Sequence, residues 1–202
     1  MTRRATIERS TNETTVRVAV ELDADPASAP ASTPASDVRT GIGFLDHMLD
    51  AFARHAKLNL TVTCTGDLDV DDHHTAEDVA LSIGQAIDEA LGDRVGITRF
   101  ASAHAPLDEA LARVVVDLSG RPGAWVDLGL TREMLGTIAC ENLTHFFQSL
   151  AIGLRSTIHV DVLKGDNDHH RVEAAFKAFA LALREAVARD GSDRVPSTKG
   201  VL

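Results

Sequence analysis

The sequence has few of the residues on which several common protein classes depend. It contains no tyrosine, one tryptophan and only two cysteines among 202 residues. Cys64 and Cys140 are far apart in the chain, each lies in an apolar stretch, and neither belongs to a Cys-x-x-Cys pair. This pattern argues against a disulfide framework or a thiolate metal site, so we expect two buried free thiols in a reducing compartment.

Long apolar runs are also missing. No stretch approaches the roughly 18 apolar residues that a membrane-spanning helix needs, and the charged start at residues 1–6 has no apolar run behind it. We therefore expect a cytoplasmic protein with no membrane partner. A hydrophobic fraction of 44% is ordinary for a globular core.

Positive charge is scarce as well. The chain carries 20 basic and 30 acidic residues, which gives a formal net charge of −10. Such a surface repels a phosphate backbone, so nucleic acid is not an expected partner. The acidity fits either a salt-adapted protein or an ordinary acidic surface, and both interpretations stay open.

Histidine, in contrast, is concentrated in two matched motifs. Residues 72–77 read Asp-His-His-Thr-Ala-Glu and residues 168–173 read Asp-His-His-Arg-Val-Glu, so four of the nine histidines lie in two His-His-x-x-Glu clusters. A further histidine in an apolar helical stretch precedes each cluster, His47 in the first half and His145 in the second. The pattern indicates an internally duplicated metal site with three histidines and one glutamate per copy.

Apolar periodicity predicts the same elements in both halves. In the first half, the predicted strands and helices cover residues 6–9, 14–22, 44–56, 58–65 and 74–91. In the second half, the matching elements cover residues 97–104, 112–118, 141–154, 156–163 and 169–189. The predicted fold class is α+β, an internal duplication of a ββαβα unit in which each copy has a mixed sheet with helices on one face.

The duplication also predicts the organisation of the chain. We expect a first repeat at residues 1–93, a second at residues 94–189 and a flexible C-terminal tail at residues 190–202. Residues 23–36 contain three prolines among alanine, serine and threonine, and they have no periodicity. That segment is expected to form a surface loop.

Helix geometry assigns the adjacent histidines to different ions. Neighbours on a helix point about 100° apart, whereas residues four apart differ by about 40°. His73 and His74 thus diverge too far to bind one ion together with Glu77. Six histidines and two glutamates divide evenly into two sites of three imidazoles and one carboxylate, which leaves open positions for substrate or water. Such sites can form between the halves of one chain or between subunits, and they would accept Zn, Mn, Fe, Co or Ni.

Other polar residues give weaker signals. His55 has no counterpart in the second half, so it either faces substrate or packs, whereas His104 and His159 are expected to be structural because neither has a supporting acid nearby. Arg99, Arg121 and the segment 197–200, Ser-Thr-Lys-Gly, suit a phosphate group. They could equally be unrelated surface cations, because the sequence alone does not bring them together.

Taken together, the motifs resemble those of the imidazoleglycerol-phosphate dehydratase family of histidine biosynthesis. The resemblance covers nearly the whole chain. The segments that carry it are residues 40–49, 66–67, 106–109, 119–122 and 195–200 and the two His-His-x-x-Glu clusters. The chain departs from the family in a longer segment at 23–36 and in Leu107, where the family commonly has methionine.

The resemblance implies a hydro-lyase that converts imidazole glycerol phosphate to imidazole acetol phosphate. It implies two manganese ions per active site and a homo-oligomer of 24 subunits built from trimers. The proton that must leave the substrate is not next to a carbonyl, so elimination needs an electron sink. Metal ions on the imidazole ring would provide one by stabilising an imidazolate or diazafulvene intermediate.

The resemblance also implies roles for individual residues. The metal ligands would be His47, His73, His74, Glu77, His145, His169, His170 and Glu173. The catalytic carboxylates would be those of Glu13, the acid or base, and of Glu77 and Glu173. The phosphorylated imidazole substrate would contact Glu13, His47, His55, His73, Arg99, Arg121, His169, Lys177, Ser197, Thr198 and Lys199.

Two other functions remain as alternatives. A metal storage or sensing protein would use the paired sites but would have no need for phosphate anchors. A dinuclear metal hydrolase would normally need bridging carboxylates, and each cluster offers one glutamate.

Overall fold

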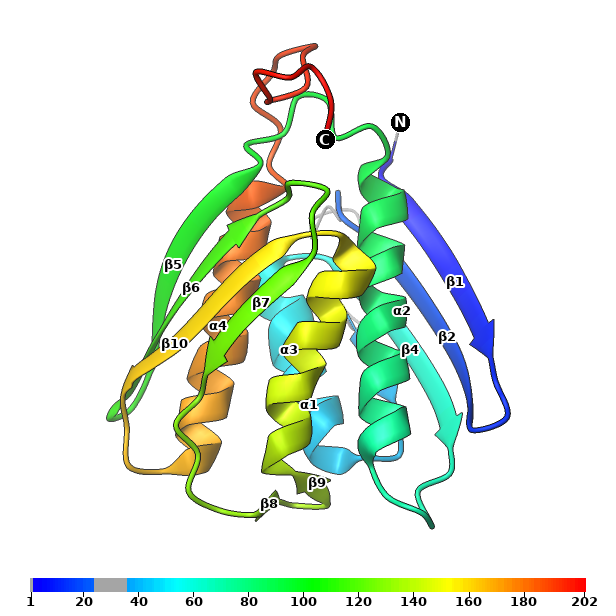
Figure 1. The fold of residues 1–202 in the computed structure, drawn as a ribbon, viewed down its shortest axis with the longest axis vertical. Coiled ribbons are helices and arrows are strands. Elements are labelled where there is room, and N and C mark those ends of the chain that lie inside the picture. Colours follow the sequence, from blue (N-terminus) through cyan, green and yellow to red (C-terminus); the bar gives the residue numbers. More distant parts are fainter. Residues whose placement is uncertain (1, 24–35) are drawn as a thin grey trace, which may run out of the picture.

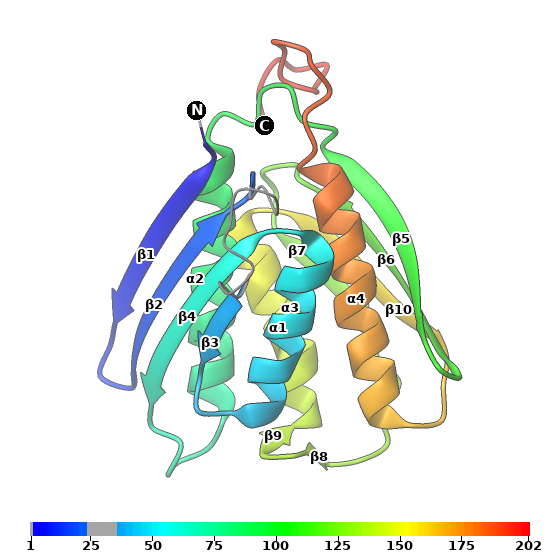
Figure 2. The same ribbon diagram turned by 180° about the vertical axis from the view of Figure 1, so that it is seen from behind.

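The computed structural model describes residues 2–23 and 36–202. In the described part of the chain, two four-stranded sheets form the outer layers and four helices lie between them (Figures 1 and 2). The surface loop predicted at residues 23–36 lies outside the described residues except at its two ends. Ser36, the last residue of that predicted loop, begins a strand instead.

The first sheet has the strand order β1-β2-β4-β3. Its strands are β1 (Arg4–Ser10), β2 (Thr14–Glu21), β3 (Ser36–Arg39) and β4 (Asn59–Gly66). The edge strand β3 runs parallel to β4, whereas the other two pairs are antiparallel. The sheet is therefore mixed, as predicted.

The second sheet repeats this topology in the order β5-β6-β10-β7. Its strands are β5 (Phe100–Leu107), β6 (Ala110–Asp117), β7 (Gly123–Asp127) and β10 (Thr157–Lys164). The edge strand β7 runs parallel to β10, so it is the counterpart of β3. The predicted duplicated α+β fold with mixed sheets is confirmed.

The predicted ββαβα unit lacks one strand per half, because β3 and β7 were not predicted. Each is short and only partly buried, so its sequence has no long alternation of apolar and polar residues. The two-residue strands β8 (Met134–Leu135) and β9 (Ile138–Ala139), which pair across a turn, were missed for the same reason.

The four helices are α1 (Gly43–Ala56), α2 (His73–Leu91), α3 (Cys140–Leu154) and α4 (Asp168–Ala186). The predicted helix at 169–189 extends too far, because the chain turns after α4 and Arg189 forms an isolated bridge with Ile97. The same bridge explains why the strand predicted from residue 97 begins only at Phe100.

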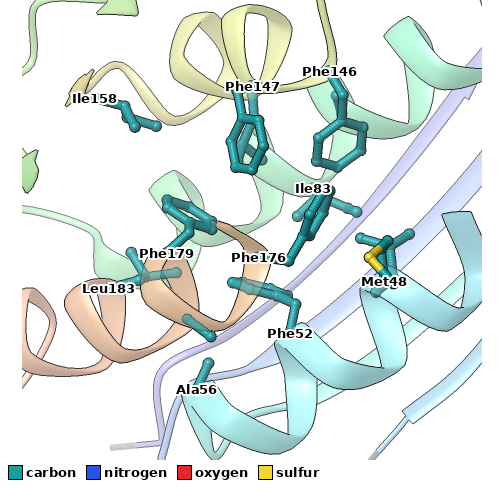
Figure 3. Packing of buried hydrophobic residues seen from close by; sticks show 14 of the residues in the cluster. Met48, Phe52, Ala56, Ile83, Phe146, Phe147, Ile158, Phe176, Phe179 and Leu183 are labelled. Atoms are coloured by element: carbon teal, nitrogen blue, oxygen red, sulfur yellow. The ribbon is translucent and has the colours of Figure 1, made fainter. Parts of the chain in front are cut away.

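The core fills the space between the helices and the inner faces of the sheets. Five phenylalanines meet there, and the ring of Phe52 on α1 stacks on that of Phe179 on α4 at 5.3 Å between centroids (Figure 3). Helices α2 and α3 cross closely, because a Cβ atom on Gly153 would lie 2.3 Å from the Leu81 carbonyl oxygen and one on Gly84 would lie 2.5 Å from Leu154 N. Glycine is required at this crossing.

The predictions for the cysteines, for membrane spans and for His104 and His159 can be compared with the structure. Both cysteines are free, Cys140 is buried and Cys64 is partly buried, and burial raises the pKa of the Cys64 thiol to about 11. No helix in the described part of the chain is both long and apolar enough to cross a membrane. His104 and His159 lie exposed on the second sheet, where the imidazole of His159 stacks on Trp125 at 4.8 Å.

The helix arrangement determines where the candidate ligands lie. All four helices begin at the same end of the molecule, the lower end in Figure 1, whereas the C-terminal tail lies at the opposite end. His73 and His169 belong to the first turns of α2 and α4, and His47 and His145 belong to the second turns of α1 and α3. Packing of the helices therefore gathers them at one end.

Candidate metal centres

The first cluster consists of His73, Glu77 and His145. One ligand atom from each lies within 4.8 Å of the others. The Glu77 carboxylate is 3.7 Å from Nε2 of His73 and 3.7 Å from Nε2 of His145, and the two imidazole rings stack at 4.7 Å between centroids. Two nitrogen donors and one carboxylate therefore face a common point.

The second cluster consists of His47, His169 and Glu173. Oε2 of Glu173 lies 3.3 Å from Nε2 of His47 and 3.2 Å from Nε2 of His169. One ligand atom from each of these three residues lies within 4.8 Å of the others. Its donor atoms are thus the same as those of the first cluster.

Each cluster combines residues of both halves, because one of its histidines comes from the half that does not supply its glutamate. His47 precedes the first His-His-x-x-Glu motif in the sequence, yet its side chain joins Glu173 of the second motif. His145 in turn joins Glu77 of the first motif. This crossing follows from the packing of α1 beside α4 and of α2 beside α3. The sequence pattern had left the pairing open.

His74 and His170 belong to neither cluster. Nδ1 of His74 lies 3.0 Å from Asp67 Oδ2, and Nδ1 of His170 lies 2.8 Å from Glu109 Oε2. The expected divergence of adjacent histidines on a helix therefore occurs at both motifs. The sequence had indicated no role for Asp67 or Glu109, although the fold places both beside the motifs.

One group of each pair has a shifted pKa. The hydrogen bond to Asp67 raises the pKa of His74, and the hydrogen bond from His170 lowers the pKa of Glu109 to about 2. In each pair the carboxylate occupies Nδ1, which leaves Nε2 as the nitrogen available to a metal. Nε2 of His74 lies 3.7 Å from Oε1 of Glu13, in the turn between β1 and β2.

Lys177 and His55 lie beside the second cluster. Nζ of Lys177 is 2.7 Å from Oε1 of Glu173. Burial opposes ionisation of Glu173, but the hydrogen bond from Lys177 and its charge outweigh this effect, so the pKa of Glu173 is lowered. Burial and the charge of Lys177 lower the pKa of His55.

The donor sets fit a divalent transition metal. Two imidazoles and a carboxylate suit Mn, Fe, Co, Ni or Zn, and thiolates take no part because both cysteines lie outside the clusters. Three donors leave room for a fourth protein ligand and for substrate on an octahedral ion. Within one chain, His74 and His170 do not fill that fourth position.

The C-terminal tail, which carries Ser197, Thr198 and Lys199, lies at the other end of the molecule (Figure 1). Nη1 of Arg99 donates to the carbonyl oxygen of Pro196 at 2.7 Å, and Nε of Arg99 donates to Asp117 at 2.8 Å. The tail also reaches Gly120, next to Arg121, because a Cβ atom on Gly120 would lie 2.7 Å from the carbonyl carbon of Leu202.

The hydroxyl and lysine of the tail lie in a turn. The Gly200 amide donates to the Ser197 carbonyl oxygen at 3.0 Å, and the Lys199 amide donates to Ser197 Oγ at 3.2 Å, with Thr198 between them. The fold therefore brings the tail to Arg99 and Arg121. It does not bring this group to the metal clusters of the same chain.

Comparison with known proteins gives one consistent family. A family model described as imidazoleglycerol-phosphate dehydratase matches residues 40–183. The imidazoleglycerol-phosphate dehydratase of Scheffersomyces stipitis is 51% identical over 221 residues, covering 100% of both chains. That of Saccharomyces cerevisiae is 50% identical over 215 residues, covering 98% of both chains.

Solved structures agree with this result. The crystal structure of imidazoleglycerol-phosphate dehydratase from Staphylococcus aureus superposes with a TM-score of 0.79 at 36% identity, covering 92% of this chain and 99% of that one. The enzyme from Pyrococcus furiosus gives a TM-score of 0.79 at 39% identity, covering 97% and 100%.

Proposed function

The chain belongs to the imidazoleglycerol-phosphate dehydratase family and carries out that family's hydro-lyase reaction in histidine biosynthesis, and we propose that it does so at metal sites shared between subunits. The observation that carries this proposal is the division of the site residues within one chain. Each cluster has three ligands, while His74 and His170 face other carboxylates and the phosphate-binding residues lie at the opposite end. A neighbouring subunit would supply the missing parts.

The proposed metal is manganese, with two ions per active site. His73, Glu77 and His145 would hold one ion, and His47, His169 and Glu173 would hold the other. His74 and His170 of neighbouring subunits would complete the two sites, each then with three imidazoles and one carboxylate. Shared ligands would couple metal binding to assembly, in accord with a particle of 24 subunits built from trimers.

The metal ions would supply an electron sink, because a cation bound to the imidazole ring of the substrate lowers the pKa of the ring nitrogen and stabilises negative charge there. The chain's own residues would hold the substrate and move the proton. His55 and Lys177 border the second cluster and would line the pocket that receives the ring.

Glu13 is the proposed acid and base. Its exposed carboxylate lies 3.7 Å from Nε2 of His74, so it would be delivered to a neighbouring subunit together with that ligand. The hydroxyl beside the ring would leave with the ring N–H proton as water, and Glu13 would then take the carbon-bound proton, whose electron pair would form the double bond of the enol. Glu13 would return that proton to the ring nitrogen, and the enol would then become the ketone.

The phosphate group would be held by Arg99, Arg121, Ser197, Thr198 and Lys199. Ser197, Thr198 and Lys199 lie together in the turn of the tail, and Arg99 is hydrogen-bonded to the tail through the Pro196 carbonyl oxygen. Each charge-assisted hydrogen bond to phosphate contributes on the order of 1.5 to 3 kcal/mol. A storage or sensing protein would have no use for this group.

Turnover by the assembled protein tests the proposal. Protein loaded with Mn should convert imidazoleglycerol phosphate to the ketone, and a phosphorylated triazole should raise the Tm only when Mn is present. An equal rise in Tm with inorganic phosphate alone, or with Mn alone, would remove the support for a shared dehydratase site.

A further inference from the structure

The two metal clusters have the same donors but different surroundings. Nδ1 of His73 lies 2.9 Å from Oδ1 of Asn142 on α3. Asn142 is buried, with 4% of its surface exposed, and its Nδ2 donates to Oδ2 of Asp72 at 2.9 Å. The Asp72 carboxylate therefore orients the amide, and the amide accepts a hydrogen bond from the imidazole and leaves Nε2 free for a metal.

The second cluster has an aromatic ring at the corresponding place. Phe44 precedes His47 by the same offset at which Asn142 precedes His145. Its ring meets His169 edge to face, with 5.1 Å between centroids and an interplanar angle of 83°. Among the described residues, His169 has no side-chain hydrogen-bond acceptor at Nδ1.

The aspartates that start the two motifs differ in the same way. Asp72 binds the amide of Asn142 and the backbone N–H of Ala139. Asp168 accepts hydrogen bonds from the backbone at Thr131 and Arg132 through Oδ2, whereas its buried Oδ1 has no partner in the described part of the chain. Among the described residues, no side-chain amide links the Asp168 carboxylate to the His169 imidazole, as Asn142 links Asp72 to His73.

The glutamate ligands differ as well. Glu173 shares its Oε1 with the ammonium group of Lys177 at 2.7 Å. The residue at the same offset from Glu77 is Leu81, which offers no charge. A cation bound at the second cluster would therefore compete with Lys177 for the carboxylate and would be repelled by its charge.

We propose that the two metal sites are inequivalent, and that Asn142 is a positioning residue that makes the His73 site the tighter one. The His169 site, with Phe44 and Lys177 around it, is the exchangeable site. The inference rests on the metal sites proposed above. Partners that orient a metal-binding imidazole typically change metal affinity by about 10- to 100-fold, which sets the expected size of the difference.

Release of metal from the assembled, Mn-loaded protein tests this inference. After addition of excess chelator, bound Mn measured over time should fall in two phases of equal size. The Asn142→Leu variant should accelerate the slow phase by about 10- to 100-fold and leave the fast phase unchanged. The Lys177→Met variant should slow the fast phase only.

A reciprocal change tests the same idea without removing a buried amide. Phe44 is only partly buried, and Phe44→Asn would place an acceptor near Nδ1 of His169. This variant should slow the fast phase, whereas the matched control Phe44→Leu, which also removes the ring but adds no acceptor, should not. If Asn142→Leu fails to assemble, the Phe44 pair still decides the question.

The outcomes separate the two proposals. Single-phase release of two ions per subunit from the wild type would overturn the inequivalence while leaving the shared dehydratase site in place. Equal slowing by Phe44→Asn and Phe44→Leu would overturn the positioning role. Wild-type protein that assembles and turns over substrate without bound Mn would overturn the proposed metal sites themselves, and the inference with them.

Discussion

The first and second halves of the chain have one topology and one set of metal donors, yet the residues around those donors differ. In the first half, Glu13 lies 3.7 Å from His74 and keeps its carboxylate exposed. In the second half, the carboxylate of the corresponding turn, Glu109, is bound directly to His170 at 2.8 Å. One copy thus has a carboxylate available for proton transfer, while the other uses it to orient a ligand.

The contact between α2 and α3 also differs from the contact between α1 and α4. Gly84 and Gly153 allow α2 and α3 to approach closely, whereas the residues at the same offsets in the other pair of helices are Ala180 and His55. His55 lies near Lys177, whose charge contributes to lowering the His55 pKa. The candidate donors are therefore the same in both halves, whereas the residues around them differ.

The largest expected effect concerns the ligands outside the clusters. His74→Ala should abolish both Mn binding and the large assembly, because it would remove the fourth ligand of a shared site. Metal analysis and light scattering measure the two properties together. His104→Ala, a change on the exposed face of β5, should alter neither. An intact large particle with stoichiometric Mn in His74→Ala would contradict shared sites.

The second effect concerns the turn carboxylates. Glu13→Gln should lower kcat by about 100- to 10,000-fold, the usual contribution of general acid–base catalysis, while Mn content and assembly stay at wild-type levels. Steady-state assays with Mn analysis measure both. Glu8→Gln on the neighbouring strand is the matched control and should keep full activity. Full turnover by the assembled Glu13→Gln variant would remove its assigned role.

The third effect compares the helix crossings. Gly153→Ala should lower the free energy of unfolding by about 1 to 3 kcal/mol, because the added methyl group would meet the Leu81 carbonyl oxygen. Denaturant unfolding measures the loss. The exposed neighbour Ile152 is the control, and Ile152→Ala should change stability by no more than about 0.5 kcal/mol. Equal stability of both variants would show that α2 and α3 can separate at no cost.

The smallest effect is a pH dependence. Because the pKa of Glu109 is lowered to about 2 from its ordinary value of 4.5, its pairing with His170 contributes to stability above pH 4.5. That contribution is lost as the pH falls through 4.5 towards 2. Metal-free Glu109→Gln should therefore lose less stability than the wild type over this range when unfolding is measured by denaturant.

A matched pair completes the pH experiment. Asp108 lies farther from His170, at 4.0 Å, and is 75% exposed, so Asp108→Asn should follow the wild-type curve. In the first half, stability is expected to depend on pH in the opposite direction, because the hydrogen bond to Asp67 raises the pKa of His74. Stability from that pair is present below pH 6.5 and is lost as the pH rises through the folded-state pKa. Parallel curves for Glu109→Gln and the wild type would contradict the pairing.

Much of the fold was predictable because its signals are local. The alternation of valines at 16, 18 and 20 predicted β2, and the spacing of apolar residues predicted all four helices to within three residues at each end. The edge strands β3 and β7 were not predictable, since four or five partly buried residues carry no clear period. Their strand conformation depends on the neighbour to which each is hydrogen-bonded.

The candidate site was also predictable only in part. The donors were predictable because a repeated His-His-x-x-Glu motif combines helix geometry with ligand chemistry. The roles of Asn142, Asp67 and Glu109 were not, because each acts on a histidine through a contact that only folding creates. A single asparagine or aspartate gives no sequence signal of such a contact.

By itself, the sequence determined the duplication and the donor types, because a short motif occurs twice, and it determined the helices and the divergence of adjacent histidines, because these follow from periodicities within one element. The tertiary structure alone decided that His47 joins Glu173 and His145 joins Glu77. It also decided that Asn142 contacts one cluster and Phe44 the other. These pairings depend on which helices pack together, and packing depends on side chains distant in the sequence.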